Sequence, residues 1–119
     1  MLRAVALVAL FSAGVAGYVA RRRFMRFVVE GESMLPAYQP GDQVVVDTKV
    51  YFSREVRAGD VVVAVDPRDP ARRLIKRVVR VEGGDIWLEG DNPDASTDSR
   101  HFGPVSGLVG MVRWRYWRG

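Results

Sequence analysis

The chain contains no cysteine and only one histidine, His101. Without cysteine it can form neither a disulfide nor a thiolate metal site, and a single histidine excludes the histidine clusters that commonly bind zinc. We therefore expect no metal and no other cofactor.

Lysine is also scarce, because only two of the 18 lysine and arginine residues are lysines. One of them, Lys76, lies in the apolar segment 74–79, where strand alternation places it on one face with Leu74 and Val78. A lysine amine can lose its proton when it is removed from water, whereas arginine stays charged. Lys76 is therefore a candidate general base. The alternative is a lysine that reaches solvent at a strand edge.

A candidate nucleophile lies upstream in the segment Gly31-Glu32-Ser33-Met34-Leu35-Pro36. This pattern predicts a turn that follows a short apolar strand and is ended by proline. In isolation, a Gly-x-Ser tripeptide is more typical of an ordinary turn. Together with Lys76, however, Ser33 indicates a hydrolase in which the serine attacks and the lysine accepts its proton.

The loop 90–104 is dense in hydroxyl and carboxylate side chains. A short hydroxyl such as Ser96 can orient a neutral amine without restoring its charge. Asp98 and Arg100 are close enough in sequence to form an ion pair that holds the loop. An ion pair that serves stability alone is an equally good interpretation.

The length of 119 residues allows one small domain, and the net charge of +4 with a pI near 10.0 could suit nucleic acid or an anionic membrane surface. Much of the excess charge has a local explanation, since four arginines cluster beside the N-terminal apolar segment: Arg21, Arg22, Arg23 and Arg26. We therefore expect no nucleic-acid partner. The sequence makes no prediction of oligomeric state.

The uncharged segment 4–20 predicts a membrane helix. We expect residues 1–23 to form a membrane anchor with a basic flank and residues 24–119 to form the catalytic domain. A cleaved signal peptide is the alternative. The two arguments about orientation conflict: the arginine cluster favours a cytoplasmic domain, whereas a protease for exported proteins should face the extracytoplasmic side.

The remainder of the chain predicts a mostly β domain. Six short apolar segments are separated by turns that often contain a Gly-Asp pair. The segments are 27–29, 43–47, 60–65, 74–82, 86–89 and 108–116. A tight polar loop is expected at 67–70. In the last strand we expect the aromatic end to join the core, with contact to a membrane surface as the alternative.

These segments resemble the boxes of the signal peptidase I family of membrane-bound serine proteases. The ordered matches are Gly31-Glu32-Ser33-Met34-Leu35-Pro36, Gly41-Asp42-Gln43-Val44-Val45-Val46, Gly59-Asp60-Val61-Val62-Val63, Leu74-Ile75-Lys76-Arg77-Val78, and Gly90-Asp91-Asn92 through Arg100. The resemblance implies a partly barrel-like β domain on the membrane surface. It also implies an exported precursor protein as substrate, with membrane lipid as the other partner.

The resemblance assigns roles to individual residues. Ser33 would be the nucleophile and Lys76 the general base, with Ser96 orienting the lysine. Asp98, Arg100 and Arg77 would support the site, and Met34 and Pro36 would contact substrate. The sequence departs from the family at Gly31, where some members carry a serine that helps bind the oxyanion. In this chain the oxyanion would therefore be bound chiefly by the backbone N–H of Ser33.

Two other functions remain open. The Asp66-Pro67-Arg68-Asp69-Pro70 loop and the arginine-rich composition also resemble the short proteases that trim the nickel superoxide dismutase precursor. A non-enzymatic, membrane-anchored basic module would account for the charge and for the aromatic residues Trp114, Tyr116 and Trp117. It would not account for the polar loop around Ser96.

Overall fold

The computed structural model describes residues 23–119. The expected membrane helix over residues 4–20 lies outside the described residues, so the division into anchor and catalytic domain stays a prediction. Within residues 23–119, no helix is both long enough and apolar enough to cross a membrane.

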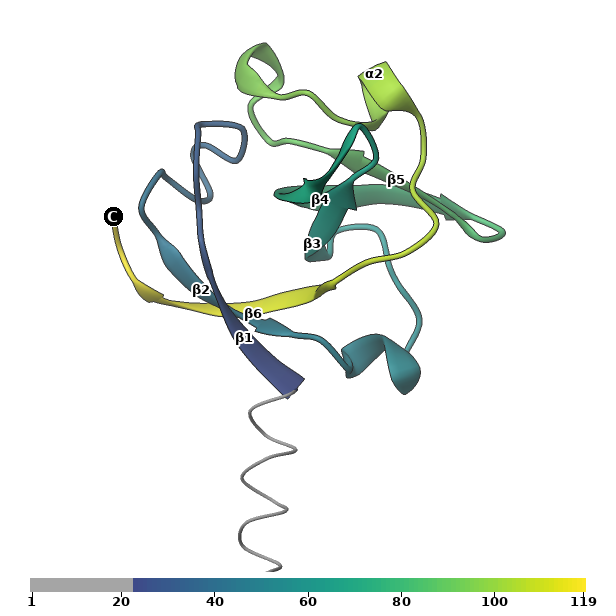
Figure 1. Cartoon of the computed structure of the whole chain (residues 1–119), viewed down its shortest axis with the longest axis horizontal. Helices are drawn as coiled ribbons and strands as arrows, with labels where there is room; N and C mark the ends of the chain where they lie inside the picture. The colour runs from purple at the N-terminus through teal and green to yellow at the C-terminus, as the bar shows by residue number, and fades with distance from the viewer. Residues whose placement is uncertain (1–22) are drawn as a thin grey trace, which may run out of the picture.

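Six strands form one antiparallel sheet in the order β1-β2-β6-β3-β4-β5 (Figure 1). The strands are β1 Phe24–Val28, β2 Gln43–Asp47, β3 Val61–Asp66, β4 Asp69–Glu82, β5 Asp85–Glu89 and β6 Gly110–Trp117. The short helices are η1 Val50–Phe52, η2 Pro93–Ala95 and α2 Ser99–Phe102. The prediction of a mostly β fold is confirmed. Among the described strands, β1 and β5 are the two edges and do not pair, so barrel-like closure stays a prediction.

Runs of valine account for the central strands, because β-branched side chains fit a pleated surface. Along β3, Val61 and Val63 enter one apolar cluster, whereas Val62 and Ala64 enter another on the opposite face. Both faces of this strand are therefore buried, and burying one such side chain stabilises the fold by roughly 1.5–3 kcal/mol.

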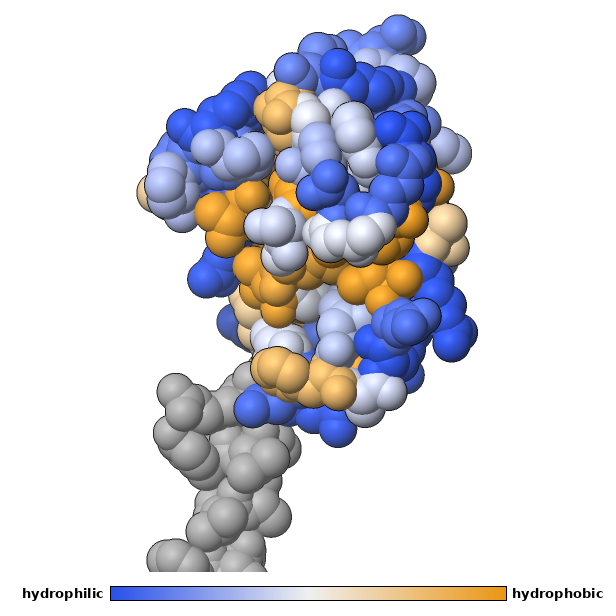
Figure 2. All heavy atoms as spheres, turned by 90° about the vertical axis from the view of Figure 1, so that its right-hand side faces the viewer, coloured by the Kyte–Doolittle hydropathy of each residue, from blue (hydrophilic) through white to orange (hydrophobic). Residues whose placement is uncertain are grey.

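The buried apolar side chains form two separate clusters. The first contains Val29, Met34, Val44, Val46, Val61, Val63, Ile75 and Val112. The second contains Val62, Ala64, Val78, Ile86, Leu88 and Val105. On the face turned toward the viewer in Figure 2, apolar side chains also reach the surface in a band between hydrophilic regions.

The polar loop expected at 67–70 is shorter than predicted. The Asp66 carboxylate accepts hydrogen bonds from the backbone N–H of Arg68 at 2.8 Å and from its guanidinium at 2.8 and 3.0 Å. These bonds close a tight hairpin, so Asp69 and Pro70 already belong to β4. The strand expected to begin at Leu74 therefore begins five residues earlier, at Asp69.

The prediction that the aromatic end of β6 joins the core is wrong. Trp114, Tyr116 and Trp117 are 50%, 41% and 63% exposed. The cause is a β-bulge. Val46 of β2 pairs with Val112, and regular antiparallel pairing would join the preceding residue, Val45, to Arg113. Val45 instead pairs with Trp114. The extra residue in β6 changes the alternation, so the side chains after Val112 no longer follow the simple period of two.

Candidate active site

Ser33 and Lys76, which are 43 positions apart in the sequence, line the same groove of about 890 Å³. One wall consists of the end of β1 and the turn around Ser33. The other wall consists of the β3–β4 hairpin and the first half of β4, and the loop around Ala95 and Thr97 also contributes. The fold therefore brings the predicted nucleophile and the predicted base to one cavity.

Lys76 is only 4% exposed and pairs across the sheet with Val62. The alternative of a lysine extending into solvent is therefore wrong. Burial lowers the pKa of Lys76; the negative charge of Asp98 opposes this shift, and the positive charge of Arg72 adds to it. The environment thus favours the neutral amine that a general base requires.

The turn that carries Ser33 is held from both sides. Gly31 adopts a φ of 71°, a conformation that favours glycine, as the chain leaves the segment after β1. Downstream, the backbone N–H of Asn92 donates to the carbonyl of Ser33 at 2.8 Å, and the Asn92 side-chain amide donates to the carbonyl of Glu32 at 3.1 Å. Asn92 lies in one of the segments that resemble the family boxes, but its function as the clamp on the Ser33 turn was not predicted from the sequence.

Gly90 lies where this turn meets the loop that carries Ser96. A Cβ atom on Gly90 would collide with the side chain of Ser96 and would lie 2.6 Å from the carbonyl oxygen of Ser33. Only glycine allows the two segments to approach so closely. The backbone of the Ser33 turn and the Ser96 hydroxyl therefore lie against the same residue.

Ser96 donates a hydrogen bond of 2.6 Å to the fully buried carboxylate of Asp98. The same carboxylate accepts bonds from the backbone N–H of Gly90 at 2.9 Å and from the Arg100 guanidinium at 2.6 and 2.9 Å. Burial raises the pKa of Asp98, but the bonds from Arg100, Ser96 and Gly90 outweigh burial and hold it well below its usual range. Asp98 is therefore a fixed negative charge that orients Ser96.

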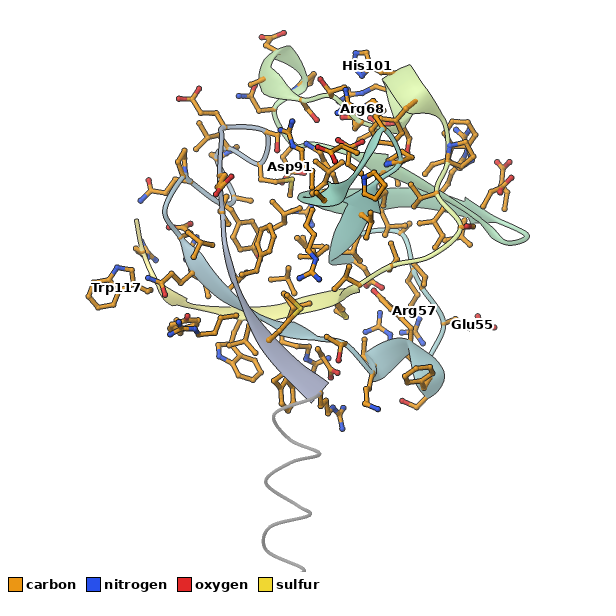
Figure 3. The ribbon with its side chains drawn as sticks, viewed as in Figure 1. Glu55, Arg57, Arg68, Asp91, His101 and Trp117 are labelled. Carbon is orange, nitrogen blue, oxygen red and sulfur yellow. The ribbon has the colours of Figure 1, made fainter. Side chains whose placement is uncertain are left out.

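The short helix α2 completes this loop. The Asp98 carboxylate caps it by accepting from the backbone N–H of Arg100 at 3.1 Å, and Nδ1 of His101 accepts from the backbone N–H of Asp98 at 3.2 Å. His101 and Arg68 lie at the same end of the molecule, beside α2 (Figure 3). The single histidine thus has a capping function in the loop.

Arg77 lies outside the groove that Ser33 and Lys76 line. Its guanidinium donates to both carboxylate oxygens of Asp91, at 2.8 and 2.9 Å, and to the carbonyl of Gly59 at 3.0 Å. Since Asp91 directly precedes Asn92, this contact positions the clamp on the Ser33 turn. Arg77 therefore supports the candidate site indirectly, through Asp91 and Asn92.

The structure does not bring the two expected substrate contacts to the groove. The side chain of Met34 is fully buried in the first apolar cluster, because an unbranched apolar chain fills that core beneath the turn. Pro36 is exposed, but it does not line the groove. Met34 therefore supports the turn from below and offers no side-chain surface to a substrate.

Residues 23–119 contain no group of three or more histidine, cysteine or acidic side chains placed to hold a metal ion. Ser33 and the buried Lys76 line the groove, and between the lining residues Ala95 and Thr97 lies Ser96, which is bound to a buried carboxylate. This set has the composition of a candidate Ser/Lys hydrolase site.

Comparison with known proteins agrees with this class. The family model described as "Signal peptidase, peptidase S26" matches residues 2–88. The chain belongs to this peptidase family.

Several relatives are subunits of mitochondrial inner membrane proteases. The chain is 36% identical over 114 residues to the Arabidopsis thaliana mitochondrial ATP-independent inner membrane protease subunit 1a, covering 75% of this chain and 68% of the relative. It is 34% identical over 109 residues to subunit 1 of the mouse inner membrane protease, covering 73% and 66%. For mouse subunit 2 the identity is 37% over 100 residues, covering 66% and 57%. The matches thus span 57% to 68% of the length of these relatives.

Proposed function

We propose that this chain is a membrane-anchored serine endopeptidase that removes signal peptides from exported precursor proteins through an acyl-enzyme intermediate. The observation that carries the proposal is the shared groove of Ser33 and the buried Lys76. Membership of the peptidase family supports the reaction class.

In the proposed mechanism, neutral Lys76 accepts the proton of the Ser33 hydroxyl as its oxygen attacks the substrate carbonyl carbon. The backbone N–H of Ser33 donates to the resulting oxyanion. The Lys76 ammonium then gives its proton to the leaving amine, which departs and leaves an ester on Ser33. A water molecule repeats the sequence on this ester, and Ser33 is restored.

The Ser96–Asp98 hydrogen bond supports a role for Ser96 in orienting Lys76. Because the Ser96 proton is directed to Asp98, the lone pairs of the hydroxyl are left as acceptors. A neutral amine could donate one N–H to Ser96 and direct its own lone pair at Ser33. Asp98 would then act through Ser96, and Arg100 would hold the carboxylate in its charged state.

The strand edges beside the groove favour an extended peptide as substrate. β4 pairs with β5 only from Arg77 onward, so its segment 69–76 has one unpaired edge within residues 23–119. β1 pairs only with β2, which leaves its other edge open in the same part of the chain. Both segments contribute to the groove. A peptide added to either edge would gain main-chain hydrogen bonds while its alternate side chains enter the groove.

A membrane location is part of the proposal. The relatives are named as inner membrane proteases. The exposed ring of Trp114 lies 6.0 Å from that of Phe24, at the start of β1, so aromatic surface lies where the chain enters from the expected anchor. Aromatic side chains of this kind favour membrane interfaces. We place the catalytic domain on the extracytoplasmic side of the cell membrane.

The alternatives receive less support. Neither the family match nor these relatives support maturation of nickel superoxide dismutase, and the Asp66–Arg68 contact gives that loop a structural function. A non-enzymatic basic module does not account for a buried lysine that shares a groove with Ser33.

Cleavage of a precursor by the purified full chain in detergent tests the proposal. We expect Ser33→Ala and Lys76→Ala each to lower kcat by about 10³-fold or more, because nucleophile and base act as one unit. The matched controls are Ser106→Ala and Lys49→Ala, which remove an exposed serine and the other lysine. Normal cleavage by either groove variant would refute the mechanism.

A further inference from the structure

The groove has walls of opposite charge. The wall after β1 contributes Glu30 and Glu32, whereas β4 contributes Arg72 and Arg73. All four residues are exposed. Two more charged residues of the hairpin, Arg68 and Asp69, also line the groove.

The hairpin residues Arg68 and Asp69 are already engaged within the protein. Arg68 binds both carboxylate oxygens of Asp66, at 3.0 and 2.8 Å, and its guanidinium lies 5.5 Å from the ring centre of Phe102. The Asp69 carboxylate accepts from the backbone N–H of Ala71 at 3.0 Å. By contrast, no hydrogen bond or ion pair joins the side chain of Arg72 to any residue from 23 to 119, although its charge helps to lower the pKa of Asp66, after the larger effects of Arg68. The guanidinium of Arg72 is therefore available to a ligand.

Arg72 lies near the proposed base Lys76, at the end of the regularly paired part of β4. Pairing with β3 is regular from Arg73 to Arg77, so alternation places Leu74 and Lys76 on one face of β4. Arg72 lies next to this segment, where the register shifts, and it lines the same groove as Lys76. The charge of Arg72 also acts on Lys76. Burial lowers the pKa of Lys76, the charge of Asp98 raises it, and the charge of Arg72 lowers it further. Arg72 thus lines the same groove as the proposed base and lies close enough for its charge to act on it.

We propose that Arg72 is a specificity-determining residue that binds an acidic side chain of the substrate, about four residues from the scissile bond. The inference rests on the proposed peptidase function. Arg72 precedes Lys76 by four residues, and a substrate strand beside β4 advances at the same ~3.3 Å per residue. The side chain opposite Arg72 would therefore lie about four positions from the carbonyl that faces Ser33. The planar guanidinium matches a carboxylate in shape and charge.

A peptide series tests this assignment. Each peptide carries one cleavage site and a single Glu moved from about six residues before the bond to about six after it, with Gln at the same position as the neutral partner. We expect the wild type to prefer Glu over Gln by about three- to fivefold in kcat/KM at one position three to five residues from the bond, mainly through a lower KM. The preference should decrease as salt is raised from about 0.02 to 0.5 M.

Variants assign the preference to one side chain. Arg72→Gln should remove the difference between the Glu and Gln peptides, and Arg72→Glu should favour a peptide with Lys at that position. The control is Arg57→Gln, which should retain the full preference, because Arg57 is exposed and lies far from the hairpin that carries Arg68 (Figure 3).

The outcomes separate the two proposals. If the wild type cleaves neither the Glu nor the Gln peptides, both the peptidase function and the inference fail. If it cleaves Glu and Gln peptides alike at every position, only the inference fails. A change in the pH profile of Arg72→Gln that is the same for both peptides, with the Glu preference intact, would also overturn it, because Arg72 would then act only on Lys76.

Discussion

The hydroxyl of Ser96 donates a hydrogen bond of 2.6 Å to Asp98, a carboxylate with no solvent exposure. This bond gives the hydroxyl a defined direction and makes its oxygen an acceptor. Ser96→Ala should therefore lower kcat by about 10²-fold, the scale on which a positioned proton-transfer group acts, while the fold is retained. Steady-state kinetics on a precursor and thermal unfolding measure the two effects.

Ser99 provides the control for Ser96. It is also buried, but its hydroxyl accepts from the backbone N–H of Leu88 at 2.8 Å. Ser99→Ala leaves that N–H without its partner and should lower the free energy of unfolding by about 1–3 kcal/mol. Its pH–rate profile should keep the wild-type midpoint. Equal kinetic effects of both substitutions would show that Ser96 acts only through stability.

The buried charge of Asp98 makes stability depend on pH in a defined direction. Its pKa in the folded state is lower than its ordinary value of 3.8, because the bonds from Arg100, Ser96 and Gly90 outweigh burial. The folded state thus binds the proton more weakly than the unfolded state. The stabilisation is present above pH ~4 and is lost as the pH falls toward the folded pKa.

Asp98→Asn should therefore be less stable than the wild type near pH 7, and the difference should shrink as the pH falls below ~4. Thermal unfolding between pH ~3 and ~7 measures it. Asp94→Asn, at an exposed residue in the same loop, is the control and should follow the wild-type curve. A difference that grows on acidification would contradict the expected sign.

Gly90 is required by close approach and not by its backbone conformation. Gly90→Ala should lower the free energy of unfolding by about 1–3 kcal/mol, because the new methyl group collides with Ser96 and the Ser33 carbonyl. The matched control is Gly84→Ala, since nothing lies within 4 Å of a Cβ there. Chemical denaturation of both variants tests this, and equal stabilities would contradict the packing of the two segments.

Gly31 is required by its backbone conformation and not by close approach. A Cβ there meets nothing within 4 Å, but the φ of 71° is unfavourable for other residues. Gly31→Ser, which restores the hydroxyl that some family members carry, should cost about 1–2 kcal/mol in stability. Denaturation measures this cost. A fully stable serine variant would show that the turn adopts another conformation.

Much of the fold follows from local pattern. Four valine-rich or alternating segments predicted strands within two residues of their observed bounds, and β2 was predicted at Gln43–Asp47 without error. The first strand was predicted at 27–29 but runs from Phe24 to Val28. The sequence pattern gave the wrong burial for the aromatic end of β6, because one extra residue forms a bulge opposite Val45 and Val46. A bulge depends on how two strands pair, so the sequence of β6 alone does not predict it. The early start of β4 likewise depends on the contact between Asp66 and Arg68.

The candidate site was predictable in part. Ser33 and Lys76 were identified from their local sequence and from the order of the family boxes. The Asn92 clamp on the Ser33 turn and the Arg77–Asp91 contact were not predicted, because each joins residues that are 14 or more positions apart. Met34 was misplaced because proximity to Ser33 in the sequence does not show which way a side chain points.

The protonation state of Lys76 is the most direct test of the central claim. The chain has only two lysines, so NMR of ¹³C-labelled lysine side chains gives two signals that a Lys49→Ala variant assigns. Because burial lowers the pKa of Lys76, we predict that its signal titrates below the ordinary value of 10.5, with kcat/KM rising through the same midpoint as the pH increases. A Lys76 signal that titrates at or above 10.5, or a rate that does not follow it, would contradict the neutral-lysine mechanism.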